Sequence, residues 1–454
     1  MTESACEHVE SLDHRTEFLD HIDTITAQWE RALAAVDADL AVVPAGVAQP
    51  YFQDDQAPVF HPNPHFARFY PDDNCEQSML LVRPGNRPRL YFHRPASYWY
   101  QAPTLPDWAE IAFDVETHTD AEALMKSLVK GVSGCGRVVL VGPAESCDLN
   151  LPLEAINPKV LVNRLQFARG TKTDFEIARL REATVVGVRG HLAARDAFRA
   201  GGSEFDIHMA YLGASEQQES KLPYPNIIAL NEHAGVLHYQ HYDRTRPAAT
   251  RSFLIDAGGR SGGYHSDITR TYSATPGDEF DDLVAALDAK QRDTVSRVEP
   301  GLSFVDLQMH MHREVADLLV SFDILRCDAE SAYEQSLTDL FFPHGLGHLL
   351  GLQTHDVGGH LASEDGELAE PPPRFPKLRF TRAVEPGYVF TVEPGIYFIP
   401  SLLKQLADSD AGRDVNWPKV ESLVSCGGIR IEDNVLVTEA GVENLTRPVF
   451  DALD

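Results

Sequence analysis

The stretch SFLIDAGGRSGGYHSDITRTYS (residues 252–273) has the pattern of a β-hairpin with a carboxylate on each arm. An apolar run ends at Asp256, a glycine-rich turn follows, and the chain returns through Asp267 with alternating apolar and polar residues. Such a hairpin brings the two carboxylates close together, where their repulsion favours a shared proton or a shared metal ion. A turn aspartate beside a solvated aspartate stays open as the alternative, because aspartate is also a common turn residue.

A second stretch, PHGLGHLLGLQTHDVGGH (343–360), places His344, His348 and His355 among several glycines. A spacing of four residues would put His344 and His348 on one face of a helix, but the glycines between them disfavour a helix. We therefore expect a glycine-rich loop or strand that presents these imidazoles, which are common ligands of transition metals.

Two further segments carry glutamates among apolar residues: YVFTVEPG (388–395) with Glu393, and GGIRIED (427–433) with Glu432. Alternation in the second segment puts Arg430 and Glu432 on the same face of a strand. An ionised glutamate inside a buried strand is costly unless it is paired or metal-bound, and a structural ion pair between Arg430 and Glu432 stays open. Two aspartates, one histidine and two glutamates together suit a pair of divalent cations, Mn or a similar ion rather than thiolate-bound zinc.

The chain of 454 residues is longer than one hydrophobic core usually serves, so two domains are expected. Short apolar runs alternate with helix-like segments over residues 1–170, which predicts an α/β domain. A capping box at Thr173 and Glu176 opens a long helix and the second domain, 171–454. There GSEFDI (202–207) is echoed by GLSFVDL (301–307), each after a long helix, which indicates an internal repeat.

The composition excludes several classes of protein. A formal charge of −29 disfavours binding to nucleic acid or to anionic lipid. No run approaches the roughly 18 apolar residues of a membrane span, and the first residues lack the pattern of a signal peptide. The cysteines are scattered without CxxC spacing and are expected to be reduced thiols in the cytoplasm; they are Cys6, Cys75, Cys135, Cys147, Cys327 and Cys426.

These residues resemble the metallopeptidases with the pita-bread fold, which include methionine aminopeptidase, aminopeptidase P and prolidase. The likeness covers about residues 172–437 and rests on the ligand order Asp, Asp, His, Glu, Glu. The prolidase (Xaa-Pro dipeptidase) subgroup, with its organophosphorus acid anhydrolase members, is similar through YPNIIALNEHAGVLHY (224–239), LRFTR (378–382) and FQDDQAPVFHPNPHF (52–66). The resemblance implies an α/β N-terminal domain, an α+β pita-bread catalytic domain with a pseudo-twofold repeat, and hydrolysis of dipeptides that end in proline.

The resemblance also implies a dinuclear metal site. Two divalent ions per subunit, Mn first and otherwise Co or Zn, would share a bridging hydroxide that acts as the nucleophile. The implied ligands are Asp256, Asp267, His348, Glu393 and Glu432, of which Asp267 and Glu432 bridge both ions. Glu393 would also carry a proton to the leaving nitrogen. Because a tetrahedral phosphorus centre resembles the peptide transition state, activity on organophosphorus compounds would be promiscuous.

Other side chains would act on the substrate. His238 and His355 would stabilise the carbonyl oxygen as it gains charge, with His344 nearby, and Arg430 would orient the carboxylates. Arg379 lies fourteen residues before Glu393, at the spacing where prolidases carry the arginine that binds the free carboxylate of the C-terminal proline. A guanidinium suits that carboxylate and would reject longer peptides by leaving its own charge unpaired.

The remaining implied residues lie farther from this constellation in sequence. Tyr224 matches an active-site tyrosine, while Asp55 and Trp99 match residues that reach into the site of a neighbouring subunit, which implies a homodimer. His265 departs from the small residue usual in the subgroup, and we interpret it as a surface histidine. Cleavage of tripeptides as fast as dipeptides would instead indicate an Xaa-Pro aminopeptidase (aminopeptidase P). A non-catalytic binding module and a metal-free creatinase-like hydrolase are disfavoured, because all five ligand positions are present.

Overall fold

The computed structural model describes residues 12–454, which form two compact units. The first unit consists of the chain up to Arg179 with Ser261–Tyr264 and Leu361–Leu368; the second consists of Leu180–Arg260, His265–His360 and Ala369–Asp454. A domain boundary at residue 170 stays a prediction. The expected reduced thiol of Cys6 lies outside the described residues, and the five cysteines within them form no disulfide.

The first unit is built on a five-stranded mixed sheet in the order β4-β3-β2-β1-β5. Its strands are β1 (Leu40–Pro44), β2 (Met79–Val82), β3 (Arg89–His93), β4 (Asp114–His118) and β5 (Val138–Leu140). β1 pairs with β5 and β3 with β4 in parallel, whereas β1–β2 and β2–β3 are antiparallel. The parallel pairs need crossover connections, and helices supply them, so the predicted α/β class of this unit is confirmed.

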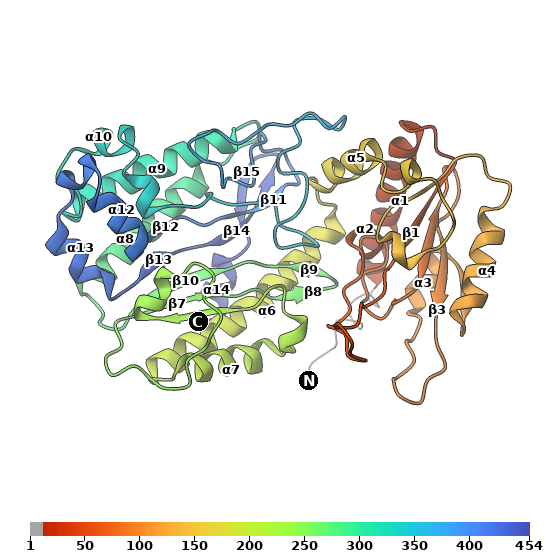
Figure 1. The fold of residues 1–454 in the computed structure, drawn as a ribbon, viewed down its shortest axis with the longest axis horizontal. Helices are drawn as coiled ribbons and strands as arrows, with labels where there is room; N and C mark the ends of the chain where they lie inside the picture. Colours follow the sequence, from red (N-terminus) through yellow and green to blue (C-terminus); the bar gives the residue numbers. More distant parts are fainter. Residues whose placement is uncertain (1–11) are drawn as a thin grey trace. The chain divides into compact units, whose positions relative to one another are not determined.

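The helices of the first unit pack on this sheet and on one another (Figure 1). They are α1 (Leu12–Ala34), α2 (Pro64–Ala67), α3 (Asp107–Ala112), α4 (Ala121–Val132) and α5 (Lys159–Arg169), with short 3₁₀ turns at Ala144–Ser146 and Leu153–Ala155. Asp120 caps α4 by accepting the backbone N–H groups of Glu122 and Ala123. Leu124 and Leu128 of α4 join the apolar cluster over the strands, because residues four apart share one helix face.

The predicted start of the next helix is correct. The backbone N–H of Thr173 donates to Glu176 Oε2 at 3.0 Å, and the backbone N–H of Glu176 donates to Thr173 Oγ1 at 3.4 Å. This reciprocal capping box opens α6 (Asp174–Arg199). Ser203 and Asp206 form the same box at α7 (Glu204–Ser215), and Ser303 caps α9 (Phe304–Ser321) through the N–H of Asp306.

The second unit repeats one order of elements. Its first half runs α6, α7, β6 (Ile227–Leu230), β7 (Ser252–Asp256), β10 (Thr269–Ser273), with 3₁₀ turns at Glu219–Lys221 and Asn231–Gly235 and the two-residue strands β8 (Arg260–Ser261) and β9 (Tyr264–His265). Its second half runs α8 (Glu279–Ser296), α9, α10 (Ala329–Glu334), α11 (Thr338–Phe341), β11 (Val389–Val392), β12 (Gly395–Tyr397), α12 (Pro400–Ala407), a 3₁₀ turn at Asp410–Asp414, α13 (Trp417–Val424), β13 (Gly428–Arg430), β14 (Asp433–Thr438), β15 (Gly441–Asn444) and α14 (Arg447–Leu453). A long helix, a serine-capped helix and antiparallel strands therefore follow one another in both halves, as the sequence echo predicts.

Strands from both halves meet at the middle of the second unit. β10 pairs antiparallel with β7, which pairs antiparallel with β6, and an isolated bridge joins Thr269 to Glu432 of the other half. Figure 1 shows these strands lying between α7 on one side and α9 on the other. Each half has its own apolar cluster. The polar residues at the strand ends between the two clusters are therefore not needed for core packing and can form a functional site. Within residues 12–454, no helix combines the length and apolar character that a membrane span requires.

Candidate metal centre and active site

The two aspartates of the hairpin meet beside a tyrosine. Register between β7 and β10 sets Asp256 opposite Thr269, and Asp267 lies two residues before Thr269. The Tyr224 hydroxyl approaches both carboxylates, at 2.8 Å from Asp256 Oδ1 and 2.5 Å from Asp267 Oδ1. A hydroxyl has one proton to donate, so it bonds one carboxylate at a time and leaves the other needing a cation or a proton.

Arg430 bonds Asp256 rather than Glu432, so the Arg430–Glu432 ion pair that the alternation left open is not the arrangement in the structure. Arg430 Nη2 lies 2.7 Å from Asp256 Oδ2, and Nη1 donates to the Tyr397 hydroxyl at 2.8 Å. Glu432, 1% exposed, instead accepts the Thr269 hydroxyl at 2.7 Å. Arg430 therefore fixes one oxygen of Asp256 and leaves the buried Glu432 without a cationic partner from its own strand.

His348 presents one ring nitrogen to the carboxylates. Its Nε2 lies 3.3 Å from Asp267 Oδ2 and 3.6 Å from Glu393 Oε1. Its Nδ1 lies 3.1 Å from the carbonyl oxygen of Leu349. Because a carbonyl only accepts hydrogen bonds, Nδ1 carries a proton. Against the effect of burial, Asp267 and Glu393 raise the pKa of His348 by favouring a second proton on Nε2, and when that proton leaves, the Nε2 lone pair faces the two carboxylates. That tautomer is the one a metal ligand needs.

A paired loop positions His348 and Glu393 together. The segment before and after His348 is neither a helix nor a free loop: the Glu393 N–H donates to Leu346 O at 2.8 Å and the Thr391 N–H donates to His348 O at 3.0 Å. These bonds run alongside β11. The expectation of a glycine-rich loop or strand for this segment is therefore correct, and its pairing with β11 places both side chains at one end of that strand.

Negative charge dominates this cluster. Burial raises the pKa of Asp256 to about 6, although Arg430 opposes the rise, and burial raises that of Glu393 to about 7. Burial and the neighbouring carboxylates raise the pKa of Glu432 well above its usual range. Burial also disfavours the charge of Asp267, but the hydrogen bond and charge of a protonated His348, with the Tyr224 hydroxyl, outweigh it and lower that pKa. These buried carboxylates repel one another, and divalent cations would relieve that repulsion.

The donor set fits metal ions. Asp267, His348 and Glu432 each offer a ligand atom, and these atoms lie within 4.8 Å of one another. All three side chains are buried. Carboxylate oxygens with one imidazole nitrogen suit hard to borderline divalent ions, whereas thiolate ligands are not part of the cluster.

Three further residues with cationic or imidazole side chains border the cluster. The rings of His348 and His355 are T-shaped, with centroids 4.5 Å apart. Partial desolvation lowers the pKa of His355 to about 4, and the charges of His348 and Arg379 add to this effect. His238 is exposed and close enough to contribute to the lowered pKa of both His344 and His355. The structure thus brings His238, His355 and Arg379 to the cluster from three separate segments.

Tyr397 is a site residue that the sequence did not single out. Its hydroxyl lies 2.9 Å from His344 Nε2, and the other ring nitrogen of His344 faces the carbonyl of Gly345 at 2.9 Å. His344 therefore accepts from Tyr397, which accepts from Arg430. Burial lowers the pKa of His344 to about 3, so the ring is neutral. Tyr397 stands in the continuously buried run Gly-Ile-Tyr-Phe at 395–398, so its position four residues after Glu393 was the only signal available for it.

His265 does not fit its interpretation as a surface histidine. It is half-buried, its Nδ1 lies 3.0 Å from Thr354 Oγ1, and its backbone N–H donates to Gly351 O at 2.9 Å. The ring therefore helps to hold the segment between His348 and His355.

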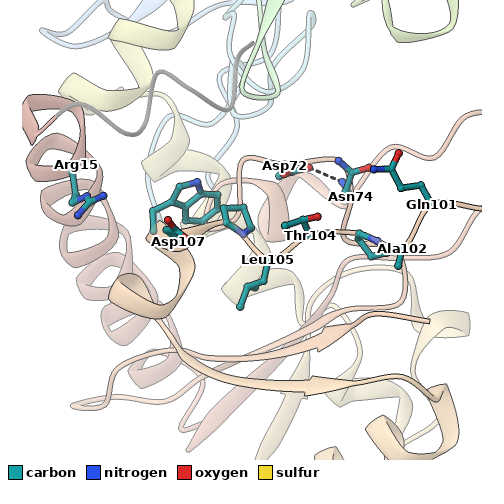
Figure 2. A pocket seen from close by; sticks show the side chains of 11 residues that line it. Arg15, Asp72, Asn74, Gln101, Ala102, Thr104, Leu105 and Asp107 are labelled. Carbon is teal, nitrogen blue, oxygen red and sulfur yellow. Dashed lines mark hydrogen bonds between the residues drawn. The ribbon is translucent and has the colours of Figure 1, made fainter. Parts of the chain in front are cut away.

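Asp55 and Trp99 belong to the first unit, whereas the site residues described so far belong to the second. Asp55 is exposed, and Trp99 is 75% exposed beside Tyr98. Their roles at the site of another subunit stay predictions. A hollow of about 450 Å³ also lies in this unit, between Arg15, Trp108 and residues 101–107 (Figure 2). None of the candidate site residues lines it.

Comparisons with known proteins show the family of the chain. The model of Metallopeptidase family M24 matches residues 178–439, and that of the Xaa-Pro dipeptidase N-terminal domain matches residues 16–167. The chain is 43% identical over 437 residues to an Xaa-Pro dipeptidase of Stenotrophomonas maltophilia (strain R551-3), with 96% of this chain and 97% of the relative covered. It is 41% identical over 432 residues to an Xaa-Pro dipeptidase of Pseudoalteromonas haloplanktis, with 95% and 97% covered.

Solved structures show the same fold. Aminopeptidase P of Escherichia coli, in a variant bound to substrate, superposes with a TM-score of 0.71 at 22% identity, covering 96% of this chain and 95% of that one. Aminopeptidase PepP of Pseudomonas aeruginosa superposes with a TM-score of 0.72 at 22% identity, covering 94% and 98%. At this identity the likeness concerns the two-domain architecture alone, and it confirms the predicted fold class.

Proposed function

Because the chain belongs to metallopeptidase family M24 and carries an Xaa-Pro dipeptidase N-terminal domain, we propose that it is a metal-dependent dipeptidase that hydrolyses Xaa-Pro dipeptides. The observation that carries this proposal is the convergence of buried carboxylates and His348 in the second unit. The curated relatives match nearly the full length of the chain, so the proposal concerns the whole protein.

We propose two divalent cations at the cluster. Asp256 would bind one cation, His348 and Glu393 would bind the other, and Asp267 and Glu432 would be shared by both. Cations bound there would polarise the scissile carbonyl and supply an activated water. Mn²⁺ is the proposed ion, with Co²⁺ and Zn²⁺ as alternatives, because carboxylate oxygens outnumber the single imidazole.

The residues around the cations have separate tasks. Glu393, which lies 3.6 Å from His348 Nε2, would carry a proton from the activated water to the leaving nitrogen. His238 and His355 would donate to the carbonyl oxygen as its negative charge grows. Arg430 holds Asp256 at 2.7 Å and so fixes the orientation of that carboxylate.

Arg379 would select dipeptides. Its guanidinium is exposed, and within residues 12–454 no carboxylate pairs with it, yet it lies near enough to His355 to lower the pKa of that ring. A free C-terminal carboxylate would pair with this cation bidentately, whereas an internal proline offers no such group. Because a longer peptide would leave Arg379 unpaired, the site would discriminate against it.

Three further proposals concern the oligomeric state, a second activity and the location of the protein. A homodimer is supported by the exposed aromatic side chains of the first unit, which include Phe52 at 91%, Tyr98 at 89% and Trp99 at 75% exposure. Promiscuous hydrolysis of organophosphorus compounds would use the same cations, because a tetrahedral phosphorus centre resembles the peptide transition state. A cytoplasmic location is proposed because the cysteines of the described residues form no disulfide with one another.

A rate comparison tests the function. Metal-loaded protein is assayed with an X-Pro dipeptide, the matching X-Pro-Y tripeptide and an X-Ala dipeptide, in Mn²⁺, Co²⁺ and Zn²⁺ and after chelation. We expect X-Pro to be hydrolysed at least about a hundredfold faster than the tripeptide, and we expect chelation to abolish hydrolysis. Equal rates on dipeptide and tripeptide would replace the dipeptidase with an Xaa-Pro aminopeptidase. Hydrolysis that survives chelation would exclude the metal-dependent mechanism.

A further inference from the structure

Glu204 is a buried carboxylate outside the metal cluster that accepts four hydrogen bonds. It is the first residue of α7, directly after the N-cap Ser203, and only 1% of it is exposed. Oε1 accepts the backbone N–H of Leu230 at 2.9 Å and the ring of His233 at 2.7 Å, and Oε2 accepts the Tyr239 hydroxyl and the backbone N–H of Asp243, both at 2.8 Å. Four donors satisfy both oxygens of this carboxylate.

All four donors lie in one segment, residues 230–243, and they flank His238. Leu230 and His233 precede it, while Tyr239 follows it directly. The Tyr239 side chain is buried, and its ring stacks on that of His233 with centroids 4.4 Å apart. His238 itself is exposed toward solvent. The ring of His238 is thus carried by a segment that is fixed to Glu204 on both sides.

We propose that Glu204 is a positioning residue that places His238 beside the reacting carbonyl. This inference rests on the proposed function, because it assumes that His238 donates to the carbonyl oxygen. Without the carboxylate, the segment keeps its strand β6 but loses the anchor next to His238. Small displacements of a donor aimed at a developing charge cost catalytic rate more than ground-state binding.

A cation site is the competing interpretation of these residues. Glu204, His233 and Asp243 could each offer a ligand atom within 4.8 Å of the others. However, the Glu204 oxygens face four N–H or O–H donors, whose positive ends occupy the positions that a cation would need. We therefore expect the number of bound metal ions per subunit to be unchanged when Glu204 is altered.

The first experiment is Glu204→Gln in the full-length, Mn²⁺-loaded protein. Glutamine keeps the volume but replaces one acceptor oxygen by an NH₂ group, which would face a backbone N–H of Leu230 or Asp243. We expect kcat on X-Pro to fall about tenfold, with KM within about twofold and metal content unchanged. Glu232→Gln, the same change on an exposed glutamate of the same segment, is the matched control and should leave kcat unchanged.

A double-mutant cycle separates positioning from general destabilisation. If Glu204 acts through His238, Glu204→Gln should have little further effect in a His238→Ala background. Equal losses in both backgrounds, an unchanged kcat for Glu204→Gln alone, or a lost metal ion would each overturn the inference. An unchanged kcat for His238→Ala alone would instead refute the role of His238 in the proposed function. If Glu204→Gln does not fold, the same cycle is measured with Tyr239→Phe, which removes only the hydroxyl beside His238.

Discussion

At the scale of single residues, Arg379 is the side chain proposed to select dipeptides over longer peptides. The change Arg379→Ala removes a guanidinium that has no carboxylate partner within residues 12–454, so the folded protein loses no internal ion pair. A charge-assisted bond to the substrate is worth about 2 kcal/mol, so we expect kcat/KM on X-Pro to fall roughly 30-fold. The rate on X-Pro-Y should change much less, and steady-state kinetics on both substrates measure the difference.

Lys377 provides the control for Arg379. It is an exposed cation two residues away in the same segment, and Lys377→Ala should leave both rates unchanged. If Arg379→Ala lowers kcat/KM equally on the dipeptide and the tripeptide, Arg379 does not bind the substrate carboxylate. It would then act only through the overall charge of the site. A partial rescue by Arg379→Lys is expected on the dipeptide alone, because lysine keeps the charge but not the planar pair of donors.

The ligand chemistry was more predictable than its supporting bonds. Clustered aspartates, histidines and glutamates stand out in a sequence because burying their charge is costly without a metal or partner. Tyr397 and Thr269 do not, since a hydroxyl is common in strands and its role depends on what lies across the fold. The bond from Thr269 to Glu432 joins residues 163 positions apart, and the pairing of Arg430 with Asp256 spans 174 positions. Only the meeting of the two halves creates them.

At the scale of elements, Gly347 lets the His348 segment lie against β11. A Cβ atom at this position would collide with the carbonyl oxygen of Thr391, which is backbone and has no room to withdraw. The change Gly347→Ala should therefore push the segment from the strand and displace His348 from Asp267. Because displacements of about 1 Å cost roughly a hundredfold in rate, we expect kcat/KM to fall by at least that factor.

Metal titration and kinetics measure the effect of Gly347→Ala. The variant should bind less Mn²⁺ at a given free concentration as well as lose activity. Gly213→Ala is the matched control, since a Cβ there meets nothing within 4 Å and the residue lies inside α7. That control should keep full activity and gain a little stability from the better helix former. Full metal binding and activity in Gly347→Ala would refute the role of the close approach.

Elements with strong local signals were predicted, and those with weak signals were not. Capping boxes depend on residues three positions apart, and the strands of the glycine-rich hairpin pair residues 13 to 21 positions apart, so one short stretch of sequence contains both partners. Strand β4, Asp-Val-Glu-Thr-His at 114–118, has no strong signal of its own, because it is an edge strand with mostly polar residues and is not one of the apolar runs. The strand-like pairing beside His348 was left undecided between loop and strand, since its hydrogen bonds go to β11, some forty residues away.

At the scale of the whole molecule, the charge of −29 has two parts. Asp256, Asp267, Glu393 and Glu432 are drawn together in the second unit, where their repulsion is unfavourable until cations bind. Over the rest of the chain, acidic residues still outnumber basic ones. That excess charge affects solubility and does not determine the fold. We therefore expect the free energy of unfolding to depend on bound cations through these few acids, although they are a small share of the total charge.

Calorimetry can measure that dependence. A metal that binds only the folded protein stabilises it by RT ln(1 + [L]/Kd), about 4 kcal/mol when free Mn²⁺ is roughly a thousand times Kd. For a catalytic unit of this size, that free energy corresponds to an increase in Tm of ~10 °C over chelated protein.

Glu432→Gln removes a buried carboxylate proposed to bridge both cations, so its Tm should rise much less on adding Mn²⁺. Glu439→Gln, on an exposed glutamate seven residues downstream, should keep the full increase. An equal increase in wild type and Glu432→Gln would mean that the cations bind elsewhere, whereas no increase in wild type would contradict a resident metal centre.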